Sequence, residues 1–110
     1  MAYDEELAAR IREHALGAPV QERKMFGGLA FLIGGHLAVA ASGRSGLLVR
    51  VDPADHDGLL AEPGAAPMEM GGRGPMVGWL RVDPEAVAGD AELAAWVERG
   101  LAYAGSLPPK

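Results

Sequence analysis

The feature of this sequence that most constrains its fold is a pair of short turn signals within its apolar middle third. Gly34-Gly35 and the small polar cluster at 42–46 separate three largely apolar segments, 25–33, 36–41 and 47–51. Connections this short leave no room for a crossover helix, so the three segments are predicted to form consecutive antiparallel strands. Within the first segment, Gly27-Gly28 predicts a β-bulge or a close approach of two backbones.

Helical patterns lie on both sides of these strands. Apolar residues recur at spacings of three and four near the N-terminus and again between 90 and 104, which predicts two amphipathic helices. Residues that favour helix ends bound both segments: Asp4 and Asp90 as N-caps, Gly17 and Gly105 as C′ residues.

The remaining segments complete the predicted order of helices and strands. Asp52-Pro53 predicts the start of a short helix and Asp83-Pro84 a single helical turn, since proline is favoured at the first helical position. Two further strands are predicted at 68–70 and 76–82. The order α-β-β-β-α-β-β-α predicts an α+β fold of two layers, an antiparallel sheet with the helices packed mainly on one face.

Charge and hydropathy exclude several classes of protein. Fifteen acidic residues against ten basic ones give a net charge of −5, whereas proteins that bind nucleic acid directly are usually strongly basic. The N-terminus is acidic where a signal peptide is basic, and no apolar run approaches the ~18 residues that a bilayer-spanning helix needs. We therefore expect a cytoplasmic protein that binds neither nucleic acid nor membranes.

Side chains suited to covalent catalysis are scarce. The sequence contains no cysteine and no threonine, and none of its serines lies in a Gly-x-Ser-x-Gly motif. Asp55-His56-Asp57 resembles a set of metal ligands, but adjacent helical residues point about 100° apart and do not converge on one ion. The glycine loop at 71–74 is not followed by a helix, as a dinucleotide-binding loop requires. We expect no catalytic residues, no metal and no cofactor.

Alternation along the predicted strands separates two faces of the sheet. Leu47, Val49 and Val51 share one face, whereas Arg50, Trp79 and Arg81 fall on the other if the registers agree. Arginine and tryptophan are enriched in interface hot spots, and guanidinium groups also bind carboxylates and phosphates. The alternative that the arginines pair with nearby acids, while Trp79 covers the core, stays open.

The chain resembles the TfoX/Sxy N-terminal domain family from residue 3 to about 107. The resemblance rests on RKMFGGL at 23–29, GH at 35–36, LVRV at 48–51, PM at 67–68, MVGW at 76–79 and LAAWV at 93–97. It implies a small α+β domain, similar in topology to secretion chaperones and often dimeric. Larger members add a helical C-terminal domain and regulate genes for DNA-uptake competence. We expect a stand-alone domain here, ordered over about 3–107, without that second domain.

Two hypotheses of different class follow. The first is a non-enzymatic interaction and regulatory module, a homodimer that also binds an unknown protein partner. Its candidate binding residues are Arg23, Lys24, Phe26, Arg50, Arg73, Trp79 and Arg81. The second is a small domain that binds or converts an anionic ligand in a cleft lined by Arg50, Arg73 and Arg81 beneath the glycine loop.

Overall fold

The computed structural model of the chain describes residues 5–25, 28–42, 46–69 and 75–109. The helical elements in these ranges are α1 (Glu5–His14), η1 (Pro53–Asp55), α2 (His56–Leu59), η2 (Pro84–Val87) and α3 (Asp90–Ser106). The strands in these ranges are β1 (Gln21–Met25), β2 (Gly28–Ile33), β3 (His36–Ala41), β4 (Leu47–Arg50), β5 (Ala65–Glu69) and β6 (Pro75–Val82).

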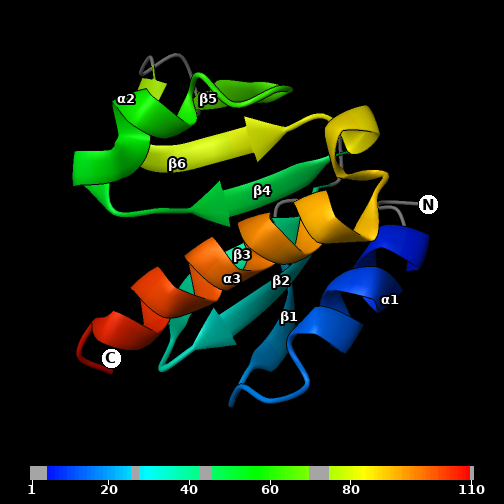
Figure 1. Cartoon of the computed structure of the whole chain (residues 1–110). Helices are drawn as coiled ribbons and strands as arrows, with labels where there is room; N and C mark the ends of the chain where they lie inside the picture. Colours follow the sequence, from blue (N-terminus) through cyan, green and yellow to red (C-terminus); the bar gives the residue numbers. More distant parts are fainter. Residues whose placement is uncertain (1–4, 26–27, 43–45, 70–74, 110) are drawn as a thin grey trace.

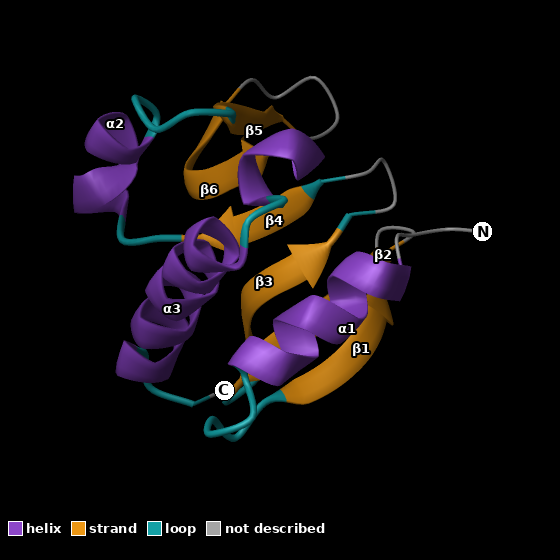
Figure 2. Ribbon diagram, turned by 45° about the vertical axis from the view of Figure 1, so that its right-hand side comes forward, coloured by secondary structure: helices purple, strands orange, loops and turns teal. Residues whose placement is uncertain are grey.

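All of these strands belong to one antiparallel sheet in the order β1-β2-β3-β4-β6-β5. The helices α1 and α3 pack together on one face of this sheet (Figures 1 and 2). The predicted α+β class is therefore confirmed, as is the predicted succession of helices and strands, with one strand more before α2 than expected.

The additional strand is β1, which lies at an edge of the sheet. Met25 pairs with Gly28 at the start of β2, so the predicted single strand over 25–33 is divided between two strands of a hairpin. An irregularity in β2 lies between Phe31 and Leu32, and Gly27 of the predicted bulge lies outside the described residues. The sequence of β1, QERKM, lacks the apolar alternation that marks a strand. Charged side chains on an edge strand discourage pairing with another chain's strand.

Each face of the sheet carries an apolar cluster. The larger one lies between the sheet and the helices and includes Phe31, Val49, Leu80 and Trp96, all buried. Each large side chain buried there stabilises the fold by about 1.5–3 kcal/mol. A smaller cluster lies on the opposite face of the sheet, which faces away from α1 and α3. Its residues alternate along the strands with those of the larger cluster. Its members are Ala30, Leu32, Leu37, Ala40, Leu48 and Met68, with Trp79 packed against them.

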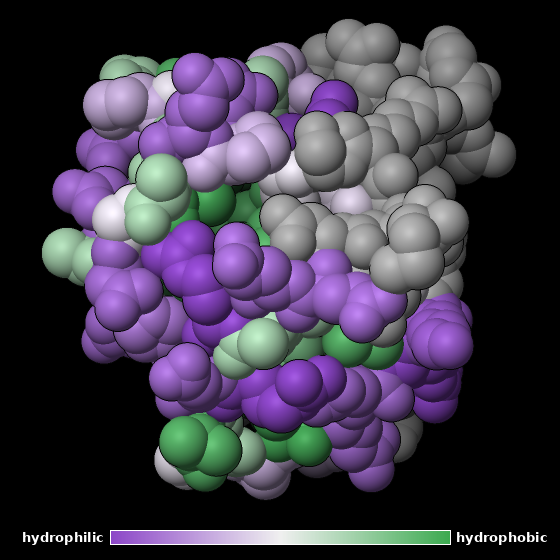
Figure 3. Space-filling view, turned by 90° about the vertical axis from the view of Figure 1, so that its right-hand side faces the viewer, coloured by the Kyte–Doolittle hydropathy of each residue, from purple (hydrophilic) through white to green (hydrophobic). Residues whose placement is uncertain are grey.

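The described part of the face in Figure 3 is mainly polar. On the face in Figure 3, hydrophilic residues predominate and hydrophobic ones form small, separate patches. Among the described residues, the large apolar side chains that stand out from the surface are Leu16 and Val77. Within the same ranges, no helix has both the length and the apolar character to cross a membrane.

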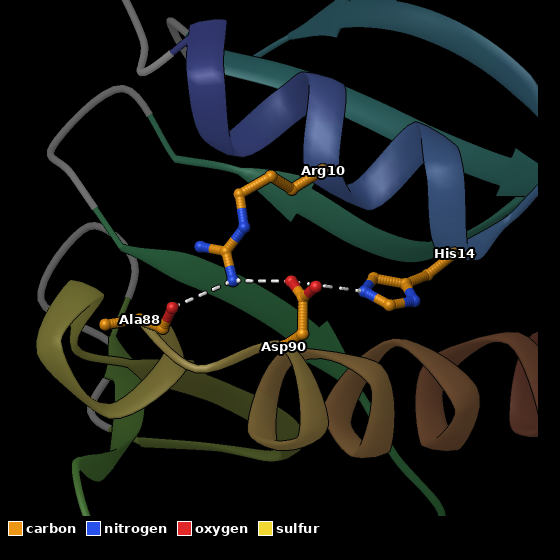
Figure 4. A network of polar contacts seen from close by, with 4 residues as sticks. All are labelled: Arg10, His14, Ala88 and Asp90. Atoms are coloured by element: carbon orange, nitrogen blue, oxygen red, sulfur yellow. Dashed lines mark hydrogen bonds and ion pairs between the residues drawn. The ribbon is translucent and has the colours of Figure 1, made fainter.

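Polar contacts join α1 to the start of α3 (Figure 4). Nη2 of Arg10 donates to the carbonyl oxygen of Ala88 and to Oδ1 of Asp90, each at 3.1 Å. Nε2 of His14 lies 3.9 Å from the same carboxylate oxygen. The carboxylate of Asp90 therefore faces α1.

The helix ends therefore differ in detail from the predicted ones. Gly89, not Asp90, is the N-cap of α3, and Gly105 lies inside the last turn rather than beyond it. The helix α1 ends at His14, before Gly17, and the predicted cap Asp4 lies outside the described residues. The prediction for η1 is confirmed, because the carboxylate of Asp52 accepts a hydrogen bond from the N–H of Ala54.

Candidate binding site

The central contact of the candidate site joins Arg50 to Trp79. The two residues are Cα partners in the register of β4 and β6, so their side chains leave the sheet on the same side. The guanidinium carbon of Arg50 lies 5.2 Å from the centroid of the Trp79 ring, within the range of a cation–π interaction. Both side chains are half-buried, so part of each remains accessible.

Arg81 extends the same surface. It lies two residues after Trp79 in β6 and pairs with Leu48 of β4 and Ala66 of β5. Since Leu48 belongs to the smaller apolar cluster, Arg81 faces away from α1 and α3, as Trp79 does. Hereafter the strand face denotes Arg50, Trp79 and Arg81. Within the part of the chain that the structure describes, neither arginine forms an ion pair.

A buried histidine fixes the backbone beside the strand face. Gly78 has a φ of 90°, and its N–H donates to Nδ1 of His56 at 3.0 Å. Its carbonyl oxygen accepts from the N–H of Val51 at 2.8 Å. Because Nδ1 of His56 accepts a backbone hydrogen, this hydrogen bond requires the tautomer with the proton on Nε2. His56 therefore orients β6 just before Trp79, a role that sequence reasoning missed.

The two basic residues of β1 lie apart from the strand face. Arg23 pairs with Ala30 of β2 and is exposed on the same side of the sheet, whereas Lys24 pairs with Leu29 and belongs to the helix side. Strands β2 and β3 separate β1 from β4, which corresponds to about 14 Å at the usual strand spacing. Phe26 and Arg73, also expected at the site, lie outside the described residues.

A groove adjoins the strand face on the helix side. The guanidinium of Arg50 also reaches the ring of Tyr103 in α3, at 5.6 Å from its centroid. Tyr103 is one wall residue of a groove of about 580 Å³ between α3 and the η1–α2 segment. The residues that line it are Val51, Asp52, Ala54, Asp55, Gly58, Leu59, Arg99, Ala102, Tyr103 and Ser106. Sequence reasoning missed it, although the spacing of Arg99 and Tyr103 places them on one helix stripe.

The side chains of the strand face supply hydrogen-bond donors and apolar surface. Two guanidinium groups offer planar arrays of N–H donors, and the indole offers a large apolar surface with one N–H. No group of three or more potential metal ligands occurs among the described residues. The resolved pKa shift lies elsewhere: hydrogen bonds from Arg12 hold the pKa of Glu22 below its usual range. The arrangement can therefore bind a carboxylate, a phosphate or a polar protein surface.

The comparisons with known proteins place the chain within one family. The sequence profile of the TfoX N-terminal domain matches residues 7–104, which is nearly the whole chain. No curated protein and no solved structure matches this chain.

Proposed function

The chain belongs to the TfoX N-terminal domain family, and from this premise we propose that it is a non-enzymatic interaction module that forms a homodimer through its strand face. As part of this proposal it acts in the cytoplasm, in competence-related regulation, and binds a further protein partner. The observation that carries the proposal is the contact of Arg50 with Trp79 beside Arg81. The register directs all three side chains away from α1, and the guanidinium of Arg50, the last residue of β4, also reaches Tyr103 of α3.

The chemistry of the strand face supports a protein partner. Tryptophan and arginine contribute a large share of binding energy at interfaces because they combine apolar area with hydrogen-bond donors. Trp79 and Arg81 are half-buried in the single chain, so a partner that completes the burial of their apolar atoms gains hydrophobic free energy.

Charge supports a second copy of the chain as that partner. The net charge of the chain is −5, yet the strand face carries two guanidinium groups without ion pairs among the described residues. In a two-fold dimer both copies present the same surface. The guanidinium groups of one copy would therefore pair with carboxylates that border the strand face of the other, and each such contact would occur twice.

Sedimentation equilibrium of the purified chain tests this proposal. We expect a dimer at micromolar concentration, and dissociation constants raised at least about tenfold by Trp79→Ala and by Arg81→Glu. The matched control is Arg12→Ala, which changes an arginine on the helix side, and it should leave the dimer intact. Far-UV circular dichroism checks the fold of each variant.

Two results would overturn the proposal. A strict monomer at high micromolar concentration excludes the homodimer. A dimer that both folded variants leave unchanged shows that the strand face is not its interface. Arg81→Glu is included because exchange of one polar side chain for another at the half-buried Arg81 disturbs packing less than truncation of Trp79, so at least one folded variant is expected.

The two guanidinium groups of the strand face, which form no ion pair within the described ranges, also favour a second candidate function. Arg50 and Arg81 lie on neighbouring strands of one sheet face, and arginine binds anions in a bidentate manner. Thermal unfolding with inorganic phosphate and with succinate tests this candidate. A stabilisation that Arg81→Ala abolishes and Arg12→Ala preserves would support an anion site, and no stabilisation by either anion would exclude one for these probes.

A further inference from the structure

We propose that the groove between α3 and the η1–α2 segment binds a small zwitterionic ligand, one ammonium group and one carboxylate on an aliphatic or peptide frame. Free amino acids and short peptides form this class. The inference does not rest on the proposed function, because it concerns other side chains on the helix side. The groove encloses about 580 Å³, which falls within the usual range of roughly 300–1,000 Å³ for ligand pockets.

Opposite charges line the two walls of the groove. The η1–α2 wall carries the carboxylates of Asp52 and Asp55, and both side chains are exposed. Oδ1 of Asp52 accepts from the N–H of Ala54, so its orientation is fixed, and among the described residues its second oxygen has no hydrogen-bond donor. The α3 wall carries the guanidinium of Arg99.

The guanidinium of Arg99 is positioned but incompletely hydrogen-bonded. Its carbon lies 4.6 Å from the centroid of the buried Trp96 ring, which holds the guanidinium against α3. Nη2 lies 3.8 Å from Oε1 of Glu62, an ion pair that is too long for a hydrogen bond. Nη1 is buried and, among the described residues, has no hydrogen-bond acceptor, so it is not the atom that a ligand reaches. Because 35% of the Arg99 side chain is exposed and its ion pair with Glu62 is long, the exposed part of the guanidinium can donate to a ligand carboxylate.

The charge pattern of the groove selects a zwitterion over a simple ion. An anion at Arg99 alone would also face the carboxylates of Asp52 and Asp55, and a cation at those carboxylates would face Arg99. A molecule with both charges satisfies both walls. Between the walls lie Val51, Leu59 and the ring of Tyr103, which can contact an aliphatic side chain.

Isothermal titration calorimetry with L-leucine and the dipeptide Ala-Leu tests this inference. We expect at least one of the two to bind the wild-type chain at millimolar concentration or below. N-acetyl-leucine lacks the ammonium charge and leucinamide lacks the carboxylate, so each should bind at least about tenfold more weakly than L-leucine. The acetylated and the amidated forms of Ala-Leu likewise lack one charge each, and each should bind more weakly than the unmodified dipeptide.

Two substitutions and one control assign the site. Asp55→Asn removes one wall charge and Arg99→Lys removes the planar guanidinium, and each should weaken binding at least about tenfold. Asp57→Asn is the matched control, since Asp57 is exposed on α2 and does not line the groove. Binding that Asp55→Asn leaves unchanged would overturn the assignment, as would the absence of binding by both probes. Neither result bears on the dimer, which sedimentation reports separately.

Discussion

Gly100 of α3 lies so close to Ala38 of β3 that a Cβ built on the glycine would be 2.4 Å from the carbonyl oxygen of Ala38. The same Cβ would lie 2.7 Å from a methyl group of Val39. No flexible side chain can move aside here, because the nearest atom belongs to the backbone. The absence of a side chain at Gly100 thus allows α3 to pack against β3, which places Arg99 and Tyr103 beside the groove.

We predict that Gly100→Ala destabilises the chain although alanine favours helix. Displacement of α3 from β3 should lower the free energy of unfolding by about 1–3 kcal/mol, as overpacking does elsewhere. Urea denaturation followed by circular dichroism measures this. Gly105→Ala in the same helix is the control: its Cβ would meet nothing within 4 Å, so we expect stability unchanged or raised by up to about 1 kcal/mol. Equal effects of the two substitutions would contradict the close packing.

A second prediction concerns His56. His56→Ala removes the acceptor of the Gly78 N–H and leaves a buried donor unpaired, which should cost about 1–3 kcal/mol of unfolding free energy beside the loss of packing. His56→Asn retains an oxygen that can accept this hydrogen bond and should recover part of the loss. Urea denaturation gives the stabilities, and amide hydrogen exchange reports the protection of Gly78. A Gly78 amide equally protected in His56→Ala would show that the histidine does not hold it.

Much of the fold could be predicted because its signals are local. The helix α3 shows apolar residues at spacings of three and four, and the short turns between β2, β3 and β4 force antiparallel pairing. β1 could not be recognised in the same way. Its residues 21–24 are exposed, and they form a strand because β2 offers an edge to pair with, which is a tertiary interaction.

The candidate site also has a part that local sequence signals predict and a part that depends on tertiary packing. Alternation with period two places Trp79 and Arg81 on one side of β6. The pairing of β4 with β6 then adds Arg50 to the same face. The distance of Arg23 from them depends on strand order, which no local pattern carries. The groove could not be predicted from the sequence either, since its lining comes from residues 51–59 and residues 99–106. Only tertiary packing brings those two segments together.

The ion pair between α1 and β1 predicts a specific pH dependence. Nε and Nη2 of Arg12 donate to the two carboxylate oxygens of Glu22 at 2.6 and 2.8 Å. These hydrogen bonds lower the pKa of Glu22, so between its folded and unfolded values the unfolded chain binds more protons. The contribution of the pair is fully present above the unfolded pKa, near 4.3. It is lost as the pH falls through the folded pKa.

Glu22→Gln isolates this contribution. The wild type should exceed the variant in unfolding free energy by about 0.2–1 kcal/mol at neutral pH, the range for exposed ion pairs. The difference should vanish in acid, as urea denaturation at a series of pH values will show. Glu98→Gln, a change at an exposed position of α3, should give no comparable difference. A Glu22→Gln difference that persists at a pH below the folded pKa would contradict the role of the ion pair.

The contact of Arg10 with Asp90 leads to a prediction about the two helices (Figure 4). In a double-mutant cycle of Arg10→Met and Asp90→Asn, we expect a coupling free energy of about 0.2–1 kcal/mol, since Asp90 is largely exposed. Arg10→Met alone should cost more than Asp90→Asn alone, because Arg10 also donates to the carbonyl oxygen of Ala88.

Salt separates the two contributions in this cycle. The coupling between Arg10 and Asp90 is electrostatic and exposed, so added sodium chloride should reduce it as the Debye length shortens. The hydrogen bond from Arg10 to Ala88 joins α1 to the backbone before α3 and should respond less. Urea denaturation of the four proteins at low and high salt measures both effects. A coupling that salt leaves unchanged would show that shape, rather than charge, relates the two residues.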